Sequence, residues 1–255
     1  MTRNKLAVLL GLCLLPVLGA CGGSEEAPVS ETPAAETAPV DTASAGTVTG
    51  AITYAGPDTD TPIAMDADPV CGGLHPTAVD TNKIAATDGK LANVFVYVKT
   101  GLEGRSFPAP AEKAEIDQNG CLYSPRVQGV QVGQAVLIKN SDPTLHNIHA
   151  LPTTNTEFNQ AQPNGLPPIE KTFDKPEVMV HFKCDVHPWM SAYIGVLPHP
   201  YFAVSATDGT FTIDKLPAGK YTLEAWHEDL GTATQDVEVT ANGTATVNFD
   251  FKPKA

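Results

Sequence analysis

The chain has 255 residues, with 16 Lys and Arg against 29 Asp and Glu. The first 20 residues hold two of the basic residues and no acidic ones, so the rest of the chain has a formal net charge of −15. This charge argues against nucleic acid or an anionic membrane surface as a partner, and it favours a basic partner or none.

The N-terminal residues have the pattern of an export signal. Arg3 and Lys5 precede an apolar run over residues 6–18, which is too short to span a bilayer comfortably. The following L-G-A-C is similar to the bacterial lipobox. That resemblance implies a lipoprotein signal peptide at 1–20 and a lipid on Cys21, with Gly22 directing the protein to the outer membrane, facing the periplasm, if the cell is Gram-negative.

Residues 21–45 are rich in Pro, Ala, Thr and Glu and almost lack large apolar residues. Such a segment cannot bury enough surface to offset its loss of conformational entropy. It is therefore predicted to be a disordered tether.

The remaining residues have the composition of β-strands. Segments rich in β-branched and aromatic residues, separated by Gly, Pro and Asn-Gly turns, lie at 94–98, 135–139, 178–182, 193–197 and 244–251. No long stretch has a helical period, so an all-β fold is predicted. A strand is also expected at 46–54, and the sequence leaves open which part of the fold holds it.

A boundary is predicted near residue 198. Beyond it, D-G-T-F-T-I and L-P-A-G-K-Y-T-L alternate strand residues with tight turns. This pattern resembles the carboxypeptidase regulatory-like (transthyretin-like) β-sandwich. For residues 199–255 the resemblance implies a small module that serves packing or presentation.

Two segments contain residues suited to a metal. Residues 184–190 read C-D-V-H-P-W-M, and residues 137–150 read L-I-K-N-S-D-P-T-L-H-N-I-H-A. Two imidazoles, one thiolate and a weak thioether form the ligand set of blue copper. His146, Cys184, His187 and Met190 would supply that set, with thiolate covalency giving electronic coupling and imidazole serving both oxidation states. Regular strand alternation would place His149 on the opposite face from His146.

At these residues the chain resembles the cupredoxins, and amicyanin most closely. The resemblance rests on Asn140…His146-Asn147-Ile148-His149 and on the short Cys184 to Met190 loop. It implies a Greek-key cupredoxin-like β-sandwich over residues 46–198, with insertions at 57–90 and 152–170. It also implies one type 1 copper held by His146, Cys184 and His187 with Met190 axial, and a supporting hydrogen-bonding role for Asn147.

The cysteines bear on this assignment. Cys13 leaves with the signal and Cys21 is lipidated, which leaves Cys71, Cys121 and Cys184. If copper holds Cys184, then Cys71 and Cys121 remain to form a disulfide. The competing idea, a second metal half-site at Cys71 and His75, has too few ligands.

Other functions are less well supported. Met is a poor ligand for zinc, and a covalently bound haem would need a C-x-x-C-H motif, which the sequence lacks. A multicopper oxidase would need additional paired H-x-H motifs, so the chain is not predicted to be an enzyme. The favoured hypothesis is electron transfer, with a redox partner docking where Pro188 and Trp189 surround His187. Copper delivery to an exported enzyme and a cell-envelope scaffold without a redox role remain as alternatives.

Overall fold

The computed structural model describes residues 44–57 and 60–254. The predicted signal peptide, the lipidated Cys21 and nearly all of the predicted tether lie outside these residues. Within the described part, no helix is long and apolar enough to cross a membrane. The described residues form strands and two short helical segments, which confirms the predicted all-β class.

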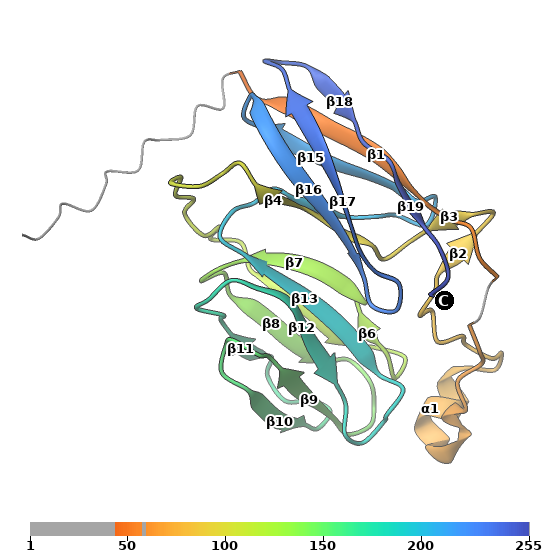
Figure 1. The fold of residues 1–255 in the computed structure, drawn as a ribbon. Coiled ribbons are helices and arrows are strands. Elements are labelled where there is room, and N and C mark those ends of the chain that lie inside the picture. The colour runs from red at the N-terminus through yellow and green to blue at the C-terminus, as the bar shows by residue number, and fades with distance from the viewer. Residues whose placement is uncertain (1–43, 58–59, 255) are drawn as a thin grey trace, which may run out of the picture. The chain divides into compact units, whose positions relative to one another are not determined.

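One pair of sheets, here called the site sandwich, uses the middle of the chain (Figure 1). Its first sheet has the order β10 (Phe158–Gln162), β9 (His146–Leu151), β12 (Glu177–Lys183), β13 (Ser191–Leu197) and β7 (Val127–Gln131). Its second sheet has the order β11 (Ile169–Lys171), β8 (Val136–Asn140), β5 (Ala114–Gln118) and β6 (Tyr123–Ser124). The predicted insertion at 152–170 thus supplies two edge strands, β10 and most of β11.

Alternating side chains explain why these strands pack face to face. In β12, for example, Val180 and Phe182 are fully buried, whereas His181 between them is only partly buried. Such alternation is the pattern of a strand with one buried face. The inward residues of both sheets form one apolar core, which includes Ile138, Ile148, Phe182, Cys184 and Met190.

The second pair of sheets, here called the terminal sandwich, combines strands from both ends of the described chain. Its first sheet has the order β15 (Thr210–Leu216), β1 (Gly46–Tyr54), β3 (Lys90–Leu91) and β2 (Ala86–Thr87), and β18 (Thr244–Thr246) and β19 (Phe249–Phe251) also pair with β1. Its second sheet has the order β14 (Phe202–Val204), β4 (Phe95–Thr100), β16 (Gly219–His227) and β17 (Gly231–Val239).

This strand pairing divides the chain differently from the predicted boundary at residue 198. Strand β1 pairs antiparallel with β15 and parallel with β18 and β19, and β4 lies between β14 and β16. Both strands therefore complete the terminal sandwich and do not belong to the site sandwich. The physical reason is burial: Val48, Ile52, Val96 and Val98 share one core with the apolar residues of the C-terminal strands.

The two sandwiches are packed together around Phe95. This fully buried side chain lies against β7 and β13, where a Cβ on Gly129 or Gly195 would come within 2.8 or 2.5 Å of its ring. Glycine is thus required at both positions for the close approach. An ion pair between Arg126 and Glu228, with nitrogen and oxygen 2.6 Å apart, also joins them.

The segment between β1 and β2 contains the described helices. These are a 3₁₀ turn, η1 (Met65–Ala67), and a short α-helix, α1 (Pro69–Leu74). Asp68 begins α1, and Pro69 occupies the first helical position, as is common at helix starts. Residues 61–80 are called the cap segment below, because Asp68 and Cys71 reach a side chain of the site sandwich.

Candidate metal centre

His146 is positioned by a polar turn between β8 and β9. The side chain of Asn140 accepts a hydrogen bond from the Asp142 backbone N–H at 3.0 Å and donates to the Thr144 carbonyl at 2.9 Å. Such Asn-centred turns compete well with continued strand pairing. The chain therefore leaves β8, turns at the sandwich end, and re-enters the sheet with His146 as the first residue of β9.

The C-D-V-H-P-W-M loop connects β12 to β13. The Met190 backbone N–H donates to the His187 carbonyl at 3.0 Å, and the His187 N–H points to the Cys184 sulfur at 3.4 Å. These contacts form a tight turn that aims Cys184 and His187 at the same point. The loop is short, so its geometry is largely set by the two strands that it joins.

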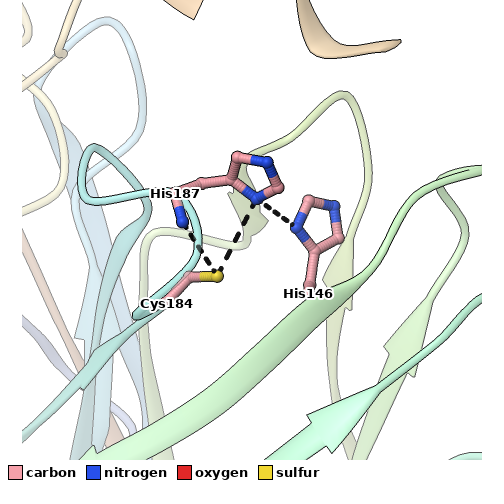
Figure 2. Close-up of side chains that lie close together, drawn as sticks. All are labelled: His146, Cys184 and His187. Carbon is pink, nitrogen blue, oxygen red and sulfur yellow. Dashed lines mark hydrogen bonds between the residues drawn. The ribbon is translucent and has the colours of Figure 1, made fainter. Parts of the chain in front are cut away.

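The side chains of His146, Cys184 and His187 converge, as Figure 2 shows. The Nδ1 atoms of the two histidines are 2.8 Å apart, and the Cys184 sulfur is 3.9 Å from the His187 Nδ1. All three potential ligand atoms lie within 4.8 Å of one another, and all three residues are buried. The sequence-predicted trio is thus brought together at one end of the site sandwich.

This donor set fits a single soft transition metal. A metal with nitrogen and sulfur donors at about 2.0 to 2.3 Å keeps the donor atoms about 3.3 to 3.8 Å apart. The sulfur to nitrogen distance of 3.9 Å is close to that range, and the 2.8 Å between the two nitrogens needs only a small outward shift. A thiolate with two imidazoles is the equatorial set that suits copper.

Met190 belongs to the core of the site sandwich. Its side chain is fully buried and belongs to the apolar cluster that also holds Cys184. A buried thioether is a weak donor, and Met190 would supply that donor to a soft metal if its sulfur reaches the ion.

Asn147 joins the two ligand segments by hydrogen bonds. Its side-chain oxygen accepts from the backbone N–H groups of Asp185 at 2.6 Å and Val186 at 3.3 Å, and its own backbone N–H points to the Cys184 sulfur at 3.5 Å. The hydrogen bonds predicted for Asn147 are therefore present, and they fix the loop that carries Cys184 and His187.

The electrostatics favour a thiolate at Cys184. Burial alone would raise the pKa of the thiol, but hydrogen bonds with His146 and with the backbone N–H groups of Asn147 and His187 outweigh it and lower the pKa. Burial likewise opposes the charged form of His146, yet its hydrogen bonds with Asp142 and Cys184 raise its pKa to about 9. Metal binding to these groups would therefore release protons.

Two carboxylates contact the imidazoles of His146 and His187, and the sequence analysis identified neither. The Nε2 atom of His146 is 2.9 Å from Asp142, and the Nε2 atom of His187 is 3.1 Å from Asp68. Burial would raise the pKa of Asp142, but its hydrogen bonds with His146 and with the backbone N–H groups of Cys121 and Gly120 together lower it. In the sequence both aspartates precede proline, which signals a turn or a helix start and gives no hint of a ligand partner.

The cap segment covers His187. The imidazole is 2% exposed and the Cys71 sulfur lies 3.6 Å from its Nε2 atom. Trp189 packs beside this ring, with centroids 5.0 Å apart, and Pro188 is exposed. A partner that docks at this end, as predicted from the sequence, would therefore meet the cap segment and not a bare imidazole.

Cys71 and Cys121 form the predicted disulfide, with their Cα atoms 5.7 Å apart. Cys184 is the free cysteine among the described residues. His75, the other half of the competing metal idea, contacts the Gly120 carbonyl at 2.7 Å instead. His149 lies on the other side of β9, where its ring contacts Asp185 at 3.0 Å and Glu157 at 2.9 Å.

Comparison with known proteins identifies relatives of parts of the chain. A family model of the carboxypeptidase regulatory-like domain matches residues 192–252, which confirms the resemblance predicted for the C-terminal residues. The match includes β13 of the site sandwich and excludes β1 and β4, which complete the terminal sandwich. No curated protein matches the chain.

Similar solved structures include three copper proteins. A purple cupredoxin from Nitrosopumilus maritimus is 24% identical over 33% of this chain and 99% of its own, with a TM-score of 0.29. A copper-containing nitrite reductase from Thermus scotoductus SA-01 is 16% identical over 58% of this chain and 28% of its own, with a TM-score of 0.32. A Cu(I) form of an amicyanin variant is 20% identical over 34% of this chain and 85% of its own, with a TM-score of 0.28.

Proposed function

We propose that this protein binds one copper ion through His146, Cys184, His187 and Met190 and carries single electrons between redox partners. The observation that carries the proposal is the convergence of two imidazole nitrogens and a buried thiol within 4.8 Å of one another. Copper bound by these residues would supply the one-electron couple between Cu(I) and Cu(II).

The residues around the site are arranged to keep its geometry constant. Asn147 holds the ligand loop to β9, and the two backbone N–H groups that face the Cys184 sulfur stabilise negative charge on it. Hydrogen bonds to a ligand sulfur tune the reduction potential of such a centre. Ligands held by two strands and a tight turn need little rearrangement when the charge at the site changes, which favours rapid electron exchange.

The proposal includes an exported, lipid-anchored location. It is supported by the L-G-A-C sequence at residues 18–21 and by the disulfide between Cys71 and Cys121, because disulfides persist in oxidising compartments. A lipid on Cys21 would tether the protein to the envelope membrane, the outer membrane facing the periplasm if the cell is Gram-negative.

A redox partner is proposed to dock at the end of the site sandwich near His187 and Trp189. Leu74 of α1 and Val186 of the ligand loop are 42% and 46% exposed there and offer apolar contact. The strong negative charge of the chain favours a partner with a basic surface.

The first experiment is to add Cu(II) to the purified protein and to record visible absorption and EPR spectra. We expect an intense thiolate-to-copper band and a narrow copper hyperfine splitting. The band should be lost in Cys184→Ser and in His146→Gln, and it should persist in the matched control His149→Gln, which alters an imidazole on the same strand outside the ligand cluster.

A colourless wild-type protein, or a Cys184→Ser variant that stays blue, would contradict the proposal. Rapid transfer of the bound copper to a chelator, without electron exchange with redox mediators, would favour copper delivery instead.

A further inference from the structure

The two ligand imidazoles have matching supports on their outer nitrogens. His146 contacts the Asp142 carboxylate through Nε2, and His187 contacts the Asp68 carboxylate through Nε2. Because both Nδ1 atoms point to the common centre, each ring has one nitrogen available for a metal and the other held by a carboxylate. Such carboxylate partners fix the tautomer of a ligating histidine and raise its basicity.

Each carboxylate accepts hydrogen bonds from two backbone N–H groups, and one of the two belongs to a cysteine of the disulfide: Cys71 for Asp68 and Cys121 for Asp142. Asp68 accepts from Val70 at 2.7 Å and Cys71 at 3.1 Å through Oδ1, which leaves Oδ2 free to contact His187. Asp142 accepts from Gly120 and Cys121, both at 2.7 Å. The disulfide therefore links the peptide groups that hold the two carboxylates.

The cap segment has further attachments to the site sandwich. The His75 ring contacts the Gly120 carbonyl at 2.7 Å, and the Trp189 indole N–H donates to the Cys121 carbonyl at 2.9 Å. Met65 packs in a small apolar cluster with the disulfide, against which Trp189 also lies. Asp68 is thus presented to His187 by a fixed structure and not by a free loop.

We propose that Asp68 is a positioning residue for His187, with Asp142 in the same role for His146, and that the disulfide-bonded cap segment exists to hold Asp68 in place. The proposal rests on the copper function proposed above. A carboxylate on Nε2–H keeps the proton away from Nδ1, makes Nδ1 a stronger donor, and places negative charge near the metal. Both effects stabilise Cu(II) more than Cu(I), so Asp68 lowers the reduction potential.

The test is the variant Asp68→Asn in the full chain. The amide oxygen can still accept the N–H groups of Val70 and Cys71, so the start of α1 is preserved. The amide NH₂ would then face Nε2 of His187 and donate to it, which favours the tautomer with the proton on Nδ1, the nitrogen needed by copper. The matched control is Asp66→Asn, an exposed residue of η1 with the same change of charge.

The first readout is the reduction potential of the copper-loaded proteins, measured by mediated titration. Loss of a residue that supports a ligand typically weakens metal affinity about 10- to 100-fold. We expect Asp68→Asn to weaken Cu(II) binding about tenfold relative to Cu(I), which for a one-electron couple raises the potential by ~59 mV. The Asp66→Asn control should change the potential by less than a third of that amount.

The second readout needs no copper. Long-range ¹H–¹⁵N spectra of the histidine rings report which nitrogen of His187 carries the proton. The spectra are recorded in the His146→Ala background, because the His146 Nδ1 atom lies 2.8 Å from that of His187 and a proton on it would by itself fix the His187 tautomer. In that background we expect the Nε2–H form with Asp68 in place and in Asp66→Asn, and the Nδ1–H form in Asp68→Asn. If the wild type binds no copper, the proposed function is rejected, and the ring spectra still decide the positioning role. The positioning role of Asp68 is overturned if the Asp68→Asn protein keeps the wild-type tautomer of His187, or if its reduction potential equals that of the Asp66→Asn control.

Discussion

Removal of the disulfide should have a large and calculable effect on stability. Cys71 and Cys121 are separated by 50 residues in the sequence and are fully buried. In the chain-entropy model, a cross-link that closes a loop of this length lowers the entropy of the unfolded chain by an amount worth about 4 kcal/mol at 25 °C. The double variant Cys71→Ala with Cys121→Ala should therefore lose about 4 kcal/mol of unfolding free energy.

The assay is guanidinium unfolding followed by tryptophan fluorescence. The chain has two tryptophans, Trp189 beside the cap segment and Trp226 on β16 of the terminal sandwich, so the assay also shows whether the sandwiches unfold together. Wild-type protein in reducing agent is the control, because it loses the cross-link and keeps both sulfur atoms. A loss below about 1 kcal/mol in both samples would refute the reasoning from loop closure.

Three further predictions follow from buried groups. Asn147→Ala should lower the unfolding free energy by about 1 to 3 kcal/mol, because the backbone N–H groups of Asp185 and Val186 lose their acceptor. Asn147→Asp keeps an acceptor and should lower the unfolding free energy by less. Denaturant titration measures the unfolding free energy of both variants. Hydrogen bonds from the backbone and side chains of Thr153 and Asn155 outweigh burial and lower the pKa of Glu177 from its ordinary 4.5 to about 2. Its contribution to stability should be complete above pH 4.5 and be lost as the pH falls toward 2, and Glu177→Gln should flatten the stability profile in that range. Phe95→Ala should cost about 3 to 5 kcal/mol by emptying the interface between the sandwiches, and a thermal melt in which its Tm equals that of the wild type would contradict the packing described here.

The convergence of the candidate ligands could be predicted because most of them are close in sequence. Cys184, His187 and Met190 lie in one seven-residue loop, and the spacing within a short loop restricts where their side chains can point. His146 follows a polar turn at the end of a strand, so its position at the same end of the fold needed only the correct pairing of β9 with β12. The pairing of Cys71 with Cys121 could be predicted because the metal hypothesis had already set Cys184 aside.

The strands predicted at 46–54 and 94–98 were recognisable as strands, but their partners were not. Alternation of apolar and polar residues shows that a strand has a buried face and says nothing about which core receives it. Strand β1 pairs with β15, β18 and β19, which follow it by more than 150 residues. Contacts over such distances leave no mark in local sequence, so the predicted boundary at residue 198 missed the N-terminal half of the terminal sandwich.

Asp68 escaped recognition for a related reason. An Asp followed by Pro has a complete local explanation as the start of a helix, and Asp68 does cap α1. Its second oxygen contacts a residue 119 positions later in the chain. A side chain that satisfies one role locally gives no sequence signal for a second role across the fold.

The path of the chain gives the terminal sandwich a part in the site. The cap segment lies in the connection between β1 and β2, two strands of the terminal sandwich, and β3, which follows β2, pairs with β1. The connection that contains the cap segment is therefore anchored in the terminal sandwich by β1 and β2 and attached to the site sandwich by the disulfide between Cys71 and Cys121. A carboxylate carried on a free loop would seldom occupy the position beside His187, whereas one fixed at three points loses little further entropy when it contacts the ring. If Asp68 positions His187 as proposed, the terminal sandwich contributes to the site by anchoring the connection that carries Asp68.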